Sequence, residues 1–153
     1  MSHEEAATMF KHILVPTDGS KLSERALKQA VQLAKESKAK VTALHVIPKF
    51  HTFTYQAEML EVTAKEYEAS TTERARQYLR FAERAATTAG VSCDSAHAFN
   101  DQPYQEIIKT ARNKKCDLIL MASHGRRGIE GFLLGSETQK VLTHSKVPVL
   151  VYR

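Results

Sequence analysis

The residues best suited to chemistry form a glycine-containing segment late in the chain. Met121-Ala122-Ser123-His124-Gly125 is followed, after nine residues, by Gly135-Ser136. Residues 117–121 before it are an apolar run typical of a buried strand, and residues 137–142 after it predict a short helix. Glycine lets the backbone approach an anion, and the first amides of a helix have no partners within it. With Arg126-Arg127 in the same loop, the segment predicts the phosphate side of a nucleotide site.

Three other features could take part in binding or catalysis. Asp18 follows an early apolar run, where it could cap a helix; Ser20 already fits that role, so ligand contact is the favoured interpretation. His124 has no identifiable titratable partner, so orientation of the loop, or a hydrogen bond to a neighbouring backbone group, is favoured over catalysis. For Arg126-Arg127, phosphate neutralisation and simple solvation are equally favoured. The histidines lack metal-ligand spacing, so no metal held by protein side chains is expected.

Length and composition fit one domain spanning residues 1–153, with an ordered core from about residue 9. The formal net charge of +5 is mild and scattered, which favours anionic ligands but is a weak argument for nucleic acid, so no nucleic-acid partner is expected. The apolar runs are the length of strands, and the first residues lack the pattern of a secretory signal. The sequence therefore predicts a cytoplasmic protein without a membrane partner.

The chain alternates predicted strands and helices. The long polar-apolar stretch 56–89 predicts a helix that Ser70-Thr71-Thr72 could break or kink and that Gly90 would end. Pro103 is placed to open a later helix, and Ser20 to cap the first. The expected strands are residues 11–16, 40–47, 91–99, 117–121 and 147–152.

This alternation predicts the fold class. Five strands separated by helices imply an α/β protein, a three-layer αβα sandwich with a mostly parallel five-stranded sheet. Ligands of such sheets bind beyond the carboxyl ends of the strands, where the strand order reverses. The connection from Ser123 to Ser136 is longer than the usual two to six residues of such loops, which also points to that edge. The final strand, apolar on both faces, is expected at an edge of the sheet.

Segments across residues 9–153 resemble the universal stress protein family. They are Val15-Pro16-Thr17-Asp18-Gly19-Ser20, His45-Val46-Ile47, the 121–136 segment and the ending from Gly135 to Val151. The nucleotide-binding branch of that family carries Gly, two residues, Gly, nine residues, Gly, then Ser or Thr. This chain has the same frame, with Ala122 in place of the first glycine. The resemblance implies a Rossmann-like fold of the adenine nucleotide alpha-hydrolase type.

The resemblance also implies roles for individual residues. Asp18 would face the ribose, Val46 would hold adenine through backbone groups, and Ala122 and Gly125 would line the ribose and phosphates. Backbone amides from Gly135 to Glu137, or the Ser136 hydroxyl, would bind phosphate, and Mg²⁺ would bridge the phosphates of ATP, ADP or AMP. A homodimer through Val147–Tyr152 is implied as well. The complete expected site consists of Pro16, Thr17, Asp18, Val46, Met121, Ala122, His124, Gly125, Arg126, Arg127, Gly135, Ser136, Glu137 and Thr138.

Whether the chain binds a nucleotide depends on the effect of alanine at position 122. A backbone contact survives the extra methyl group unless the residue needs a positive φ or the ligand packs on its Cα. We therefore expect a protein that binds an adenine nucleotide as a regulatory ligand in a stress response, with slow hydrolysis at most. The alternatives are a nucleotide-free adaptor of the same family and an adenylating or ATP-hydrolysing enzyme of a related fold, although Pro16-Thr17-Asp18-Gly19-Ser20 lacks the signatures of those enzymes.

Overall fold

The protein is built on a five-stranded parallel sheet. The computed structural model describes residues 9–51, 57–125 and 133–153. The sheet has the order β3-β2-β1-β4-β5, and all four neighbouring pairs are parallel. The predicted architecture is confirmed, and β5 is an edge strand as expected. The strands are β1 (His12–Pro16), β2 (Lys40–Ile47), β3 (Cys93–Phe99), β4 (Leu118–Ala122) and β5 (Val149–Tyr152).

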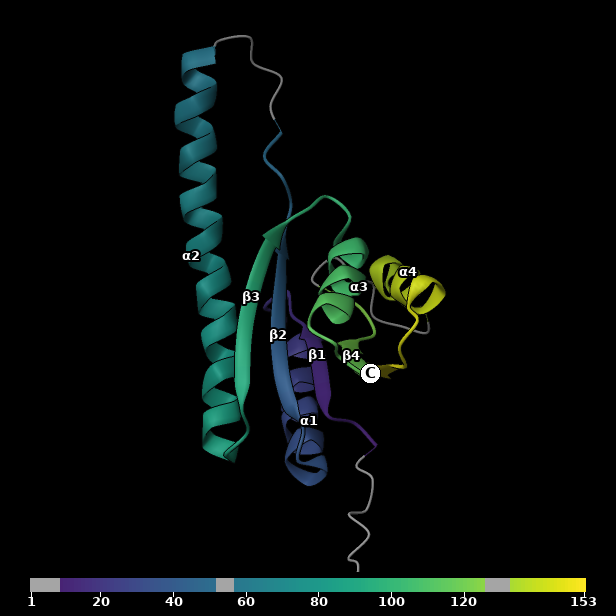
Figure 1. Cartoon of the computed structure of the whole chain (residues 1–153). Coiled ribbons are helices and arrows are strands. Elements are labelled where there is room, and N and C mark those ends of the chain that lie inside the picture. Colours follow the sequence, from purple (N-terminus) through teal and green to yellow (C-terminus); the bar gives the residue numbers. More distant parts are fainter. Residues whose placement is uncertain (1–8, 52–56, 126–132) are drawn as a thin grey trace, which may run out of the picture.

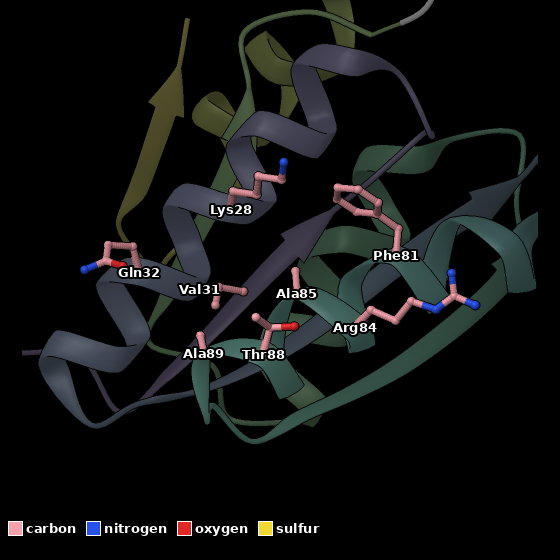
Figure 2. A pocket seen from close by; sticks show the side chains of 8 residues that line it. All are labelled: Lys28, Val31, Gln32, Phe81, Arg84, Ala85, Thr88 and Ala89. Carbon is pink, nitrogen blue, oxygen red and sulfur yellow. The ribbon is translucent and has the colours of Figure 1, made fainter.

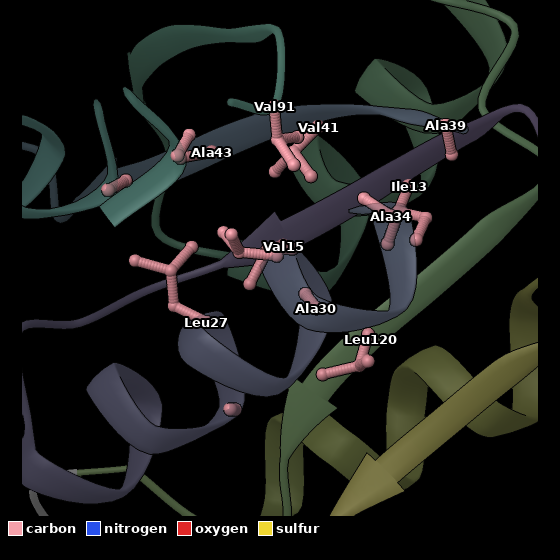
Figure 3. Packing of buried hydrophobic residues seen from close by; sticks show 14 of the residues in the cluster. Ile13, Val15, Leu27, Ala30, Ala34, Ala39, Val41, Ala43, Val91 and Leu120 are labelled. Carbon is pink, nitrogen blue, oxygen red and sulfur yellow. The ribbon is translucent and has the colours of Figure 1, made fainter. Parts of the chain in front are cut away.

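Two helices cover each face of the sheet (Figure 1). α1 (Lys21–Ser37) and α2 (Ala57–Ala89) pack on one face, and α3 (Pro103–Asn113) and α4 (Ser136–His144) on the other. Alternate residues of each strand point to opposite faces, so Val15 and Leu120 join the α1/α2 core shown in Figure 3, whereas Leu14 joins the α3/α4 core. Burial of apolar side chains on both faces holds the three layers together.

The first helix begins where the sequence predicts. Ser20 has an extended backbone, and its hydroxyl accepts a hydrogen bond from the Ser23 amide at 3.2 Å. This bond satisfies one of the amides that a helix leaves unpaired at its start. Pro103 likewise opens α3, as expected.

The expected break in the second helix is absent, because α2 runs without interruption from Ala57 to Ala89. Ser70 and Thr71 fit into the helix because both hydroxyls donate to the Tyr67 carbonyl, at 3.1 and 2.6 Å. The helix ends at Gly90, whose φ of +73° favours glycine, as predicted. Over the residues that the structure describes, no helix is both long and apolar enough to cross a membrane.

A polar cluster joins three strands at the amino-terminal edge of the sheet. The buried imidazole of His12 is 2.6 Å from the Thr42 hydroxyl through Nε2 and 3.0 Å from the Lys114 carbonyl through Nδ1. Thr42 donates to the Asp94 carboxylate, which also accepts from the Lys114 ammonium group at 2.9 Å. Burial, and then the charge of Lys40, hold the pKa of His12 below its ordinary 6.5. Burial alone would raise the pKa of Asp94, but hydrogen bonds from Thr42 and Lys114 bring it below 3.8.

These shifts predict a loss of stability in acid. Because the native state resists protonation of His12, the unfolded state binds more protons as the pH falls below 6.5, and the free energy of unfolding decreases. Asp94 adds a second decrease below pH 3.8, since its native pKa is also lowered. Urea unfolding of the His12→Gln variant should show a shallower decrease between about pH 7.5 and 5.5 than the unsubstituted protein. The exposed His144, replaced by glutamine, is the control; an unchanged slope in His12→Gln would contradict the prediction.

Candidate functional site

The candidate site lies where the direction of the chain across the sheet reverses. The chain passes from β1 through α1 to β2 on one side, and from β3 through α3 to β4 on the other, so β1 and β4 are neighbours. The connections that leave their carboxyl ends diverge, which creates a crevice in doubly wound sheets. Here the two connections touch: a Cβ added to Gly125 would overlap Oδ2 of Asp18. The structure therefore brings Asp18 and Gly125, which are far apart in the sequence, into contact.

Asp18 shapes the turn after β1. Its Oδ1 accepts a hydrogen bond from the Ser20 amide at 2.9 Å, while Oδ2 lies against Gly125. Gly19 has a φ of +76°, and its amide donates to the Thr17 hydroxyl at 3.2 Å. The turn role weighed for Asp18 is thus present, and it fixes the carboxylate in the crevice.

Pro16 and Thr17 end β1 and direct the chain into this turn. The Thr17 amide donates to the Leu44 carbonyl at 2.8 Å, which is the last bond between β1 and β2. Its buried hydroxyl lies 3.1 Å from Oγ of Ser23, inside the fold. Thr17 is therefore placed to hold the turn through its side chain.

Val46 lies on β2, two residues beyond Leu44, which pairs with the last residue of β1. The orientation of its peptide groups follows from three hydrogen bonds. Val41 donates to Ser92 on the β3 side of β2, and Ile47 accepts there from Asn100, whereas Leu44 accepts from Thr17 on the β1 side. Peptide groups alternate along a strand, so the N–H and C=O of Val46 point to the β1 side. Since β1 ends at Pro16, these two groups face the crevice.

The end of β4 shows the backbone and the packing of Ala122. Among the described residues other than glycine, only Lys38 and Lys115 have positive φ, so Ala122 occupies an ordinary strand conformation. It is 8% exposed and belongs to the α1/α2 core, whereas Met121 is buried in the α3/α4 core. Both side chains therefore serve packing, and only their backbone groups are available at the edge.

The start of α4 stands directly over this edge. The Gly135 amide donates to the Ser123 carbonyl at 2.7 Å, and a Cβ at Gly135 would lie 3.1 Å from Cα of His124. The Thr138 hydroxyl donates to the Ala122 carbonyl at 3.0 Å. The first helical bond runs from Gln139 to Gly135, so the amides of residues 136–138 have no acceptor within the helix. Together they form a cluster of donors suited to an anion.

The remaining predicted residues are Glu137, His124 and the two arginines of the loop. The carboxylate of Glu137 accepts from the Tyr104 amide at 2.9 Å and from Lys140 at 3.3 Å, so the side chain is engaged between α3 and α4. Nδ1 of His124 lies 3.3 Å from the Ser123 hydroxyl, a side-chain group and not the backbone group that was expected. Arg126 and Arg127 lie outside the described residues. Within the described ranges, no three His, Cys, Asp or Glu side chains gather where they could hold a metal ion.

Two side chains at the site were missed by sequence reasoning. Nδ1 of His45 is 2.7 Å from the Thr17 carbonyl, and its ring meets the Tyr78 ring edge to face at 5.1 Å. Tyr78, from α2, lies against Gly19, where a Cβ would overlap its ring. The Asp18-Gly19 pair marks the turn in the sequence, but nothing local to residue 78 indicates what this tyrosine contacts.

The parallel sheet with two helices on each face places the protein in the three-layer, doubly wound α/β class. Residues 9–153 match the model of the universal stress protein family. The universal stress protein YxiE of Bacillus subtilis is 34% identical over 149 residues, which cover 95% of this chain and all of that protein. The chain therefore belongs to the universal stress protein family.

Solved structures agree with this assignment. The structure of MJ0577 of Methanocaldococcus jannaschii matches with a TM-score of 0.80 and 31% identity, covering 94% of this chain and 96% of that one. A universal stress protein in complex with cAMP matches with a TM-score of 0.65 and 26% identity, covering 94% of this chain and 97% of that one. The fold and the family predicted from the sequence are thereby confirmed.

The attachment of α4 to β4 can be tested by substitution of Thr138. The Thr138→Val variant keeps the side-chain shape but loses the donor to a buried carbonyl, so it should destabilise the protein by about 1–3 kcal/mol. Thr143→Val on the same helix is the control, because its hydroxyl bonds to Gln139 on an exposed face; about 0.5 kcal/mol or less is expected. Urea unfolding measures both, and equal losses would show that the Thr138 bond has no special role.

Proposed function

We propose that this protein binds an adenine nucleotide in the crevice between β1 and β4 and uses it as a regulatory ligand in a cytoplasmic stress response. The observation that carries the proposal is the convergence of three kinds of groups at one edge: the Val46 peptide groups, the Asp18 carboxylate and the amides of α4. A relative of the same family is in complex with cAMP. ATP, ADP and AMP share the parts that these groups would recognise.

Each part of the nucleotide has a counterpart among the residues. The Val46 N–H would donate to a ring nitrogen of adenine, and its C=O would accept from the exocyclic amino group. Asp18 would accept from a ribose hydroxyl. The amides of Gly125 and residues 136–138, together with the exposed Ser136 hydroxyl, would donate to phosphate oxygens, and Arg126 and Arg127 would add positive charge.

Mg²⁺ would enter with the phosphates. The groups at the start of α4 are hydrogen-bond donors, which suit a phosphate and not a cation. When bound, Mg²⁺ would neutralise part of the phosphate charge, while the amides of the chain hold the remaining oxygens.

A regulatory role is favoured over turnover because the crevice is equipped to bind and orient. The Glu137 carboxylate is held by Tyr104 and Lys140, and Asp18 is held in its turn. The nucleotide-free alternative depended on the methyl group of Ala122, and that residue belongs to the α1/α2 core. Regulation would then require that the nucleotide bind two states of the protein with different affinity.

Thermal unfolding of nucleotide-stripped protein tests the site. ATP with Mg²⁺ at about 100 times its Kd should add about 2.7 kcal/mol, a rise in Tm of about 5–11 °C, whereas GTP should give little. Asp18→Ala removes the predicted ribose acceptor, and Gly125→Ala displaces the Asp18 carboxylate. Each should weaken binding about tenfold or more, which lowers the shift by about 3–6 °C at the same nucleotide concentration.

Asp101→Ala is the matched control for this experiment. Asp101 is also an aspartate after a strand at the same edge of the sheet, but it follows β3 and bonds Lys49 and His51. It should leave the nucleotide shift unchanged. A flat response of the unsubstituted protein to ATP, ADP and AMP would reject the proposed function in favour of the nucleotide-free adaptor. Release of pyrophosphate or phosphate at a useful rate would favour the enzyme.

We further propose a homodimer through the C-terminal strand. In the part of the chain that the structure describes, β5 is the last strand on its side of the sheet, and Leu150 is 41% exposed on it. An apolar edge strand of this kind readily pairs with another chain.

Light scattering after size exclusion tests the dimer. The protein should have twice the 17.2 kDa mass of one chain, and Leu150→Lys should shift it to the mass of the monomer, because charge at an edge opposes strand pairing. Leu142→Lys is the control, since Leu142 is 42% exposed but lies on α4. A monomer before any substitution would refute this assembly.

A further inference from the structure

A groove runs between α1 and α2 on the surface that faces away from the sheet. Lys28, Val31 and Gln32 line it from α1; Phe81, Arg84, Ala85, Thr88 and Ala89 line it from α2. Its volume is about 470 Å³. From Phe81 to Ala89 it follows α2 for about 12 Å, which is two helical turns. Figure 2 shows Val31, Ala85 and Ala89 gathered between the helices, with Lys28 reaching from α1 towards Phe81.

The floor of the groove is apolar. Val31 is buried, and Phe81, Ala85 and Ala89 are half-buried against the α1/α2 core. These side chains are packed between the two helices. A second apolar surface placed on them would extend the core outward.

The lining of the groove includes two cations, one from each helix. Lys28 and Arg84 are exposed, and neither belongs to any ion pair among the described residues. The Lys28 ammonium group stands 5.7 Å from the centre of the Phe81 ring, so charge and apolar surface meet there. Gln32, also in the lining, donates to Glu36 at 2.9 Å.

From this pattern we infer that the α1/α2 groove docks a short amphipathic helix of a partner protein, with apolar side chains on the floor and carboxylates beside Lys28 and Arg84. A helix laid in a groove between two helices presents apolar residues at i, i+3, i+4 and i+7, and two turns of contact match the length of this groove. Unpaired cations next to apolar surface select a ligand that carries the opposite charge next to its apolar stripe.

The charge of the groove argues against a second copy of this chain as the occupant. Lys28 and Arg84 would there face a chain that itself carries a net charge of +5, which is a poorer electrostatic match than an acidic segment. An acidic helix is attracted by the same field. An interface of two turns is small, so the complex is expected to be transient.

Selection from a display library of short helical peptides tests this inference. Apolar positions at helical spacing are fixed, and the flanking positions encode Glu, Lys, Ser or Ala. Selection on the full-length protein should enrich Glu over Lys at the flanks, and the enriched peptides should shift the amide resonances of Val31, Ala85 and Ala89. The Lys28→Gln/Arg84→Gln variant should bind them about tenfold more weakly or worse.

The control variant is Lys35→Gln/Arg74→Gln, which removes the same charge from exposed positions on the same two helices outside the groove. It should retain binding within about twofold, and circular dichroism should show both variants folded. Failure to enrich any peptide, enrichment of Lys, or equal losses in both variants would overturn the inference. So would binding to phosphatidylglycerol vesicles through Lys28 and Arg84 without binding of acidic peptides, because the groove would then face an anionic membrane.

Discussion

The pairing of β1 with β4 is the constraint on which the rest of the structure depends. The register joins Ile13 to Leu118 and Leu14 to Ile119, in the most buried part of the sheet. Because β1 feeds a crossover to one side and β4 receives one from the other, this pair defines where the connecting loops separate. The apolar residues that form the pair carry no chemistry, yet they bring the Asp18 turn and the start of α4 to one edge.

Hydrogen bonds between main-chain and side-chain groups then convert this placement into a defined surface. The Gly135–Ser123 and Thr138–Ala122 bonds fix the start of α4 to the end of β4. The Asp18–Ser20 bond fixes the turn after β1. Groups held in this way lose little conformational entropy when a ligand binds. Several hydrogen-bond donors that are individually weak can therefore contribute to affinity together.

The sequence was most informative where a local pattern determines structure. The apolar periodicity, the Ser20 cap and the Gly90 stop each depend on neighbouring residues, and each is confirmed. The break expected at Ser70-Thr71-Thr72 was wrong, because composition does not reveal that the hydroxyls of Ser70 and Thr71 bond back into the helix. Tyr78 against Gly19 was not predictable, since that contact depends on how α2 lies across the sheet. The groove between α1 and α2 depends on the same packing of distant segments.

Ala122 shows which glycines a loop of this kind requires. Its methyl group belongs to the core and its backbone is ordinary strand, so the path of the chain does not require glycine there. Gly19 and Gly125 differ, because a methyl group at either position would overlap a neighbouring side chain. A search pattern that demands glycine at every position of the frame would discard chains with the same loop. A pattern weighted by steric need, strict at 125 and 135 and permissive at 122, would retain them.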